Sequence, residues 1–268
     1  MKHISTGAAI AIIILSGINS GFAQELETET ARLLKQGNAK FGTAFEYQTS
    51  QAGKEYAIPV FLGYGITDRI ELVIEPVPYT KIQAAGITPA TGIGDAEITL
   101  SYLLKYESSS FPAIALAGEI KIPTAKNTLI GTGKTDYALY LIGSKNIGGV
   151  DVHANVNYTI HGNPEGASLM NTWFFAGAFE YGMSDHFLLF GEIYGNTASI
   201  AGSESDSGVP TTGGATLPSE ASTGEVVGSL GAGYYLSAGL LGSFSVSYDN
   251  NNATLIRAAL SYTFPLIP

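Results

Sequence analysis

The chain of 268 residues contains no cysteine, and only 13% of its residues are charged. Without cysteine it has no disulfide framework, no thiolate metal ligand and no cysteine nucleophile. It also lacks an apolar run of the ~20 residues that a membrane-spanning helix needs. Glycine, tyrosine and phenylalanine are abundant, at 33, 15 and 12 residues. Low charge with many glycines and aromatic residues is typical of short strands joined by turns, which predicts an all-β sandwich or barrel.

The first 23 residues have the composition of a cleaved secretory signal. Lys2 and His3 give a cationic start, residues 7–15 form an apolar core, and Gly21-Phe22-Ala23 puts small residues at the cleavage positions. A membrane anchor, the alternative, requires a longer apolar run. We predict that residues 24–36 form a periplasmic N-terminal segment or plug and that residues 37–268 form one domain.

The charge balance of the predicted mature chain is strongly acidic. Removing Lys2 from the 13 basic residues leaves 12 against 23 acidic ones, a formal charge of −11. A polyanion of this kind is a poor partner for nucleic acid.

Most of the mature chain alternates between apolar and polar residues. From Val150 to Ile160, valines, Ala154 and Tyr158 alternate with Asp151, His153 and asparagines. Because successive side chains of a strand point to opposite faces, this pattern predicts a strand between two different environments. It recurs in twelve segments, at about 41–47, 56–64, 70–75, 96–105, 114–122, 136–144, 150–160, 172–181, 187–196, 226–236, 242–248 and 254–264. An even number of such strands predicts a single twelve-stranded antiparallel transmembrane β-barrel, whose closure satisfies every backbone donor and acceptor in lipid.

Turn residues and aromatic residues mark the strand ends. The motif Tyr64-Gly-Ile-Thr-Asp68 returns as Tyr181-Gly-Met-Ser-Asp185, and in each the tyrosine suits the lipid headgroup layer while glycine and aspartate suit a tight turn. Other aromatic residues expected at strand ends are Tyr47, Tyr102, Tyr158, Trp173, Tyr234, Tyr248, Tyr262 and Phe264. Short links at 65–69, 107–110, 146–149, 182–185 and 237–240 alternate with longer ones, the longest at 197–224. This predicts short periplasmic turns and longer extracellular loops.

Four segments resemble one known family. They are GIGDAEITLSYLLKY (92–106), ALAGEIKIPTAKN (115–127), GTGKTDYALYLIGSK (131–145) and FGEIYGNT (190–197). They are similar to the outer-membrane transporters grouped as the MetA pathway of phenol degradation family. The most specific marks are Gly92, Gly94 and Asp95, the run Lys121–Pro123, and Thr135-Asp136-Tyr137. The resemblance implies a twelve-stranded outer-membrane barrel with a role in the uptake of hydrophobic or aromatic compounds.

The predicted partners are outer-membrane lipid, the barrel assembly machinery and a small hydrophobic or aromatic solute. The C-terminus departs from the usual barrel pattern, because Pro265-Leu-Ile-Pro268 follows the aromatic Phe264 that the assembly machinery is expected to read.

The alternation assigns most charged side chains to the lumen. A cation facing lipid at the membrane midplane would cost ~2–4 kcal/mol. The predicted lumen-lining charged residues, with one histidine, are Lys40, Glu46, Glu71, Glu75, Asp95, Glu97, Lys105, Glu119, Lys121, Asp136, Asp151, His153, Glu180, Glu192 and Arg257. The predicted lumen aromatic residues are Phe61, Tyr140, Phe174, Phe190, Tyr194 and Tyr235. The excess of acids predicts a polar network that fills the barrel, or a pore that disfavours anions, or both.

These features favour an outer-membrane channel or facilitator for passive uptake in a Gram-negative bacterium. Two alternatives stay open: a non-conducting structural or adhesin-like barrel acting through its loops, and a hydrolase using His153 with Asp151. No nucleophile motif accompanies that pair, and GTGKTD has Thr128 where a phosphate-binding loop needs glycine. We therefore predict no catalytic residue, no metal and no cofactor.

Overall fold

The computed structural model describes residues 26–84, 86–164, 168–199 and 224–266. The predicted signal and most of the predicted 197–224 loop lie outside these ranges. The regular elements of the described residues are strands, and none of these residues forms a helix long and apolar enough to cross a membrane. The strands are β1 (Asn38–Thr49), β2 (Gly53–Ile58), β3 (Val60–Thr67), β4 (Ile70–Glu75), β5 (Tyr79–Ala84), β6 (Ala90–Gly92), β7 (Ala96–Lys105), β8 (Ala113–Ile122), β9 (Asp136–Ile147), β10 (Val150–Ile160), β11 (Thr172–Gly182), β12 (Phe187–Asn196), β13 (Glu225–Ser237), β14 (Leu240–Asp249) and β15 (Thr254–Pro265).

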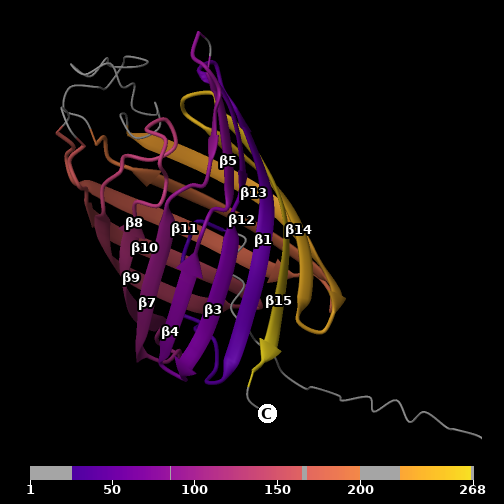
Figure 1. Ribbon diagram of the computed structural model, residues 1–268. Coiled ribbons are helices and arrows are strands. Elements are labelled where there is room, and N and C mark those ends of the chain that lie inside the picture. The colour runs from indigo at the N-terminus through magenta and orange to yellow at the C-terminus, as the bar shows by residue number, and fades with distance from the viewer. Residues whose placement is uncertain (1–25, 85, 165–167, 200–223, 267–268) are drawn as a thin grey trace, which may run out of the picture.

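Twelve strands of the described chain close into one antiparallel barrel (Figure 1). Around the barrel they follow the order β1, β3, β4, β7 and then β8 to β15. Closure comes from β1 and β15, which pair along their whole length, from Asn38 opposite Pro265 to Thr49 opposite Thr254. The predicted twelve-stranded barrel is confirmed.

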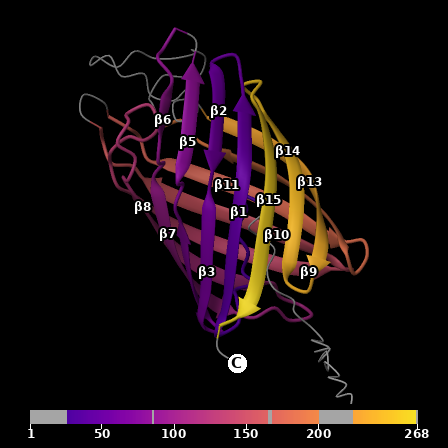
Figure 2. The same cartoon turned by 45° about the vertical axis from the view of Figure 1, so that its right-hand side comes forward.

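Three neighbouring strands of the barrel are interrupted next to one another. Pro59 separates β2 from β3, Pro76-Val77-Pro78 separates β4 from β5, and Gly94 lies between β6 and β7. Proline has no N–H to donate to a ladder, and the bonds re-form around the breaks: Val60 donates to the Pro76 carbonyl at 2.9 Å, and Gly94 to the Val77 carbonyl at 2.8 Å. As a result, β2, β5 and β6 continue the sheet beyond β3, β4 and β7 (Figure 2).

The sequence prediction is wrong in this region. The alternation predicts one strand over 56–64 and a loop over 80–92. Pro59 divides the first, and β5 and β6 occupy much of the second. Alternation does not register a missing N–H, and the three residues of β6 are too few to show a period.

The two ends of the barrel differ in their connections. At one end, which we call the short-turn end, the links are short, and Gly148 and Gly149 form the β9–β10 turn with φ of 61° and 91°. Two successive positive φ values characterise a hairpin turn that favours glycine. The other end, the long-loop end, carries the longer connections (Figure 1).

The outer surface of the barrel is apolar between two sets of aromatic rings. Large hydrophobic side chains are exposed around its middle, among them Leu100, Leu116, Leu139, Leu141, Phe175, Ile193, Leu230 and Val246. Rings lie at the short-turn end, including Tyr102, Tyr181, Tyr234 and Tyr262, and at the long-loop end, including Tyr47, Tyr158, Trp173 and Tyr248. A continuous apolar surface of this size requires an apolar environment.

Close packing of the lumen depends on Gly231, which is the cross-strand partner of Phe190 where β13 pairs with β12. A Cβ on Gly231 would overlap the ring of Phe190, whose side chain is 1% exposed. Gly228, on the same strand, has open space at its Cβ position. We expect Gly231→Ala to lower the free energy of unfolding by about 1–3 kcal/mol, because the buried ring must shift.

The measurement is the urea midpoint of the refolded protein in lipid vesicles, with Gly228→Ala as the matched control. Equal midpoints for the two variants would contradict this account of the packing.

Candidate functional site in the barrel lumen

The lumen holds a cavity of about 380 Å³. Ten of the predicted lumen residues line it: Lys40, Glu46, Phe61, Glu71, Glu75, Asp95, Glu97, Glu119, Tyr140 and Arg257. Inward-facing positions on the adjoining wall of β15 and β1 are occupied by the small residues Gly42, Ala44 and Ala259, which leave room for the cavity.

The first described residues, 26–36, fold inside the barrel, and we call them the inner segment. Side chains of the wall bind its backbone one after another: Glu192 accepts from the Thr28 N–H at 3.0 Å, and Ser144 Oγ accepts from the Ala31 N–H at 2.8 Å. Asn155 both accepts from the Glu29 N–H and donates to the Glu29 carbonyl. The inner segment therefore lies against β9, β10 and β12, and seven of its residues form one wall of the cavity.

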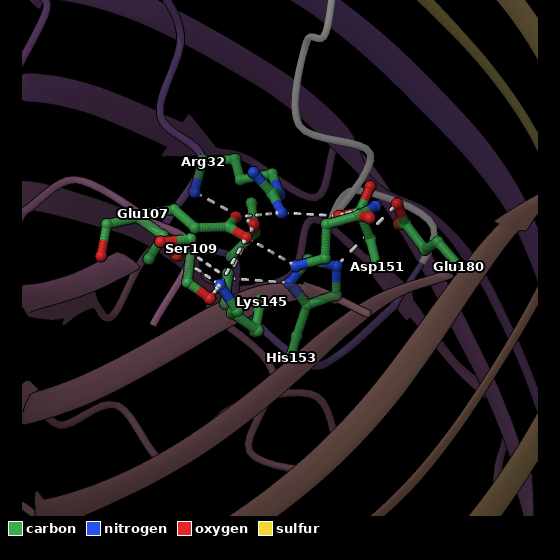
Figure 3. A network of polar contacts seen from close by, with 12 residues as sticks. Arg32, Glu107, Ser109, Lys145, Asp151, His153 and Glu180 are labelled. Atoms are coloured by element: carbon green, nitrogen blue, oxygen red, sulfur yellow. Dashed lines mark hydrogen bonds and ion pairs between the residues drawn. The ribbon is translucent and has the colours of Figure 1, made fainter. Parts of the chain in front are cut away.

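Arg32, in the middle of the inner segment, forms ion pairs with the barrel wall at the short-turn end. Its guanidinium Nη2 lies 2.7 Å from Glu107 Oε2 and 2.6 Å from Asp151 Oδ1, and Lys145 also pairs with Glu107 at 3.2 Å (Figure 3). Glu107 is in the β7–β8 connection and Asp151 is on β10. One arginine thus joins the inner segment to two parts of the wall.

The glycines of the repeated motif have different roles. A Cβ on Gly65 would overlap the carbonyl oxygens of Leu34 and Lys35, whereas Gly182, its counterpart in the second copy, has open space there. The inner segment passes directly over β3 at this point, and the Gly37 N–H donates to the Gly65 carbonyl at 2.8 Å. Gly65 is therefore required by the inner segment as well as by the turn.

Arg257 ties the barrel closure to the inner segment. It is the cross-strand partner of Glu46 on β1, and its guanidinium bonds Glu46 at 2.7 Å and Glu27 at 2.6 Å. Charge-assisted bonds of this length are among the stronger ones in proteins.

The residues that are most specific to the family resemblance lie close together at the long-loop end of the barrel. Lys121 Nζ lies 2.6 Å from Asp136 and 3.8 Å from Asp95, and Asp136 also accepts from His161 and from the Gly162 N–H. Asp95 accepts from the Ala125 N–H at 3.0 Å. These residues fix the 123–135 and 161–164 connections to the barrel.

Two carboxyl groups in the cavity stand opposite each other on neighbouring strands, and Lys121 is the partner of Glu97 on its other side. Glu75 on β4 and Glu97 on β7 are direct cross-strand partners. Within the described residues, neither has a hydrogen bond or an ion pair. Two ionised carboxylates in this position would repel each other, so a cation beside the pair would favour its ionised form.

The remaining predicted residues lie outside the cavity. His153, Glu180 and Glu192 are buried in the wall behind the inner segment, with His153 Nδ1 2.8 Å from Ser144 Oγ. The rings of Phe174 and Tyr194 face each other at 5.8 Å, and Tyr235 packs against the cluster that contains Phe190.

Lys105 does not face the lumen. A bulge between Leu103 and Lys105 shifts the register, so that Lys105 is paired with the outward-facing Ile114. Its ammonium lies 3.5 Å from the centroid of the Phe111 ring. The alternation misplaces it because a bulge changes the face on which every later residue lies.

The surroundings of His153 do not favour a hydrolase. Ser144, the hydroxyl beside it, is 1% exposed and is covered by Ala31. A nucleophile must reach its substrate. Among the described residues, no group of three or more histidine, aspartate or glutamate side chains is arranged to hold a metal ion.

No sequence pattern identifies the polar residues of the inner segment, Glu27, Glu29 and Arg32. They precede the first strand and follow no alternation. Glu107, Ser144 and Asn155 were also missed as its partners, because the contacts join residues more than 70 positions apart.

The fold is similar to those of solved outer-membrane channels. The COG4313 outer membrane channel from Pseudomonas putida F1 has a TM-score of 0.63 and 11% identity, over 86% of this chain and 97% of that one. The NanC porin has a TM-score of 0.56 and 10% identity, over 83% and 98%. The KdgM porin has a TM-score of 0.55 and 12% identity, over 83% and 99%. At this identity the likeness concerns the fold.

Neither protein-family models nor curated protein sequences give a match. The resemblance to the MetA-pathway family stays a prediction.

Seating of the inner segment should depend on Gly65. We expect Gly65→Ala to displace Leu34 and Lys35, so that trypsin cleaves after Arg32 at least tenfold faster than in the unaltered protein, measured by mass spectrometry. Gly182→Ala makes the same change in the other copy of the motif and should leave the rate unchanged. Equal cleavage of all three proteins would contradict the contact.

The pKa of Glu107 should report the Arg32 contact. Partial burial acts to raise this pKa, but hydrogen bonds from the Asn146 N–H, Lys145 and Arg32 outweigh it and lower the pKa from its ordinary value of 4.5. A lowered pKa means that the contact stabilises the protein above pH 4.5 and that this contribution is lost as the pH falls through the lowered value.

We expect carboxyl-carbon NMR to give a pKa for Glu107 below 4.5, and Arg32→Gln to move it upward. The shift should be partial, because Lys145 and Asn146 remain as partners. An unchanged value in Arg32→Gln would contradict the ion pair.

Proposed function

We propose that this protein is an outer-membrane channel for passive uptake of small solutes, and that its lumen favours cationic and neutral solutes over anions. The observation that carries the proposal is the acid-lined cavity inside a closed barrel with an apolar outer surface. The likeness of the fold to channels and porins supports it.

The proposed setting is the outer membrane of a Gram-negative bacterium. The exposed apolar belt between two sets of rings suits hydrocarbon between two headgroup layers. In this proposal residues 1–23 direct export and are removed, the assembly machinery inserts the barrel, and the short-turn end faces the periplasm.

The charge of the cavity determines the proposed ion preference. Its lining includes eight carboxylates and three basic side chains, Arg32, Lys40 and Arg257. A wall with an excess of one sign raises the local concentration of ions of the other sign. Glu75 and Glu97, which form no ion pair among the described residues, should contribute to this preference when they are ionised.

The proposed solute class is small hydrophobic or aromatic compounds. Phe61 and Tyr140 line the same cavity as the carboxylates, and ring faces can stack on a planar solute. About 380 Å³ falls in the usual range for small-molecule sites.

The direct test is single-channel recording in a planar bilayer. We expect a current that favours cations, and a cation-to-anion permeability ratio at least twofold lower for Glu75→Gln with Glu97→Gln, because two side chains that face the cavity can then no longer ionise. Asp185→Asn removes a charge in the β11–β12 turn and is the control, with a ratio close to that of the unaltered protein.

A folded barrel with an anion-favouring current would contradict the proposed selectivity. A folded barrel without current, including a variant that lacks residues 26–36, would contradict channel function and favour a barrel that acts through its loops.

A further inference from the structure

We propose that the inner segment, Leu26–Gln36, is a gate: it turns about Gly37 and leaves the lumen as a unit, which opens the channel. This inference rests on the proposed channel function. It assigns a moving part to that function and names the contacts that hold the part closed.

The inner segment adds no strand to the barrel. Its backbone bonds are made mainly with side chains, from Glu192, Asn155, Ser144 and Glu71. The backbone ladders of the twelve strands are complete without it. When the segment leaves, these hydroxyl, amide and carboxylate groups can bond water instead, so the barrel wall does not have to unfold.

A hinge lies where the inner segment joins β1. Gly37 has φ of 80°, its N–H donates to the Gly65 carbonyl at 2.8 Å, and its carbonyl accepts from the Leu266 N–H at 2.8 Å. These bonds hold Gly37 on the barrel at the short-turn end. A left-handed residue fixed on both sides is a natural pivot for the residues before it.

Besides these backbone bonds, three sets of contacts hold the gate closed. Arg32 bonds Glu107 and Asp151, Glu27 bonds Arg257, and apolar side chains dock on the wall. Leu26 lies in a cluster with Ala178, Leu188, Phe190 and Leu241, and Ala31 lies in one with Leu103, Ala115 and Ile142. None of these sets includes a backbone pair of the sheet, so each can break without opening the barrel.

Displacement of the inner segment would enlarge the open space in the lumen. Seven residues of the inner segment form one side of the cavity, and side chains of β15, β1, β3, β4, β7, β8 and β9 form the rest. With the segment removed, the cavity joins the space along β9, β10 and β12. The open lumen would then expose Asn155 and Glu192 to solute.

The absence of cysteine makes a reversible lock possible. Thr30 Oγ1 and Ser144 Oγ are 3.2 Å apart, so Thr30→Cys with Ser144→Cys places two sulfurs within reach of a disulfide between segment and wall. Ser229 and Ser247, cross-strand partners on β13 and β14 with hydroxyls 2.6 Å apart, give the control pair Ser229→Cys with Ser247→Cys. Both pairs lie in the lumen, but only the first restrains the inner segment.

The experiment compares single-channel current before and after reduction with dithiothreitol. We expect the oxidised Thr30–Ser144 lock to hold the channel in its low-conductance state, and reduction to restore openings at least tenfold more frequent. The control variant, Ser229→Cys with Ser247→Cys, should give the same single-channel current before and after reduction. If the double-cysteine variant conducts and its single-channel current is the same before and after reduction, the proposed gating by the inner segment is wrong, whereas the proposed channel function is unaffected.

A second readout does not need current. Thr30 is 8% exposed and Ser247 is 7% exposed. A maleimide therefore reaches a cysteine at either position only when the surrounding residues move and expose it. We expect Thr30→Cys to be labelled at least tenfold faster than Ser247→Cys in vesicles. Equal rates would overturn the gate even if the channel is silent, whereas faster labelling in a silent barrel would keep the moving segment and contradict the channel.

Discussion

The pairing of β1 with β15 is the constraint on which the rest of this structure depends. Once that seam closes, each of the twelve barrel strands has two neighbours, and the sheet has an inside and an outside. An apolar outer surface then forces charged side chains inward, because charge facing lipid is costly. The Glu46–Arg257 pair lies on the seam itself and reaches Glu27 of the inner segment. Closure, lumen charge and the seating of the inner segment are therefore parts of one arrangement.

The lumen is divided by the size of the side chains around it. Small residues on β15 and β1 leave the cavity open on that side, whereas Ser144, Asn155 and Glu192 reach inward and bind the inner segment on the other. The acids consequently fall into two groups. Some form ion pairs that stabilise the structure, as Asp136 does with Lys121. Others, such as Glu75 and Glu97, face the cavity and form no ion pair within the described chain. The second group gives the lumen its electrostatic character.

The interruptions at Pro59, Pro76-Val77-Pro78 and Gly94 are compensated by structure nearby. The 123–135 connection covers the neighbouring edge, with Thr124 donating to the Gly94 carbonyl at 2.7 Å and Ala125 to Asp95. The residues that mark the family resemblance therefore build the long-loop end of the barrel. Their shared position indicates a structural role at the rim.

The sequence by itself determined the barrel. A two-residue alternation is a local property, so it identifies strands, their apolar faces and the side on which Glu97 or Arg257 must lie. It could not determine the place of Lys105, because one bulge reverses the face, or the break at Pro59, because alternation continues across it. The motif Tyr-Gly appeared twice as the same turn, yet only Gly65 meets the inner segment. The contacts of Arg32, Glu27 and Thr28 were decided by tertiary structure alone, since they join residues that closure brings together and that no local pattern relates.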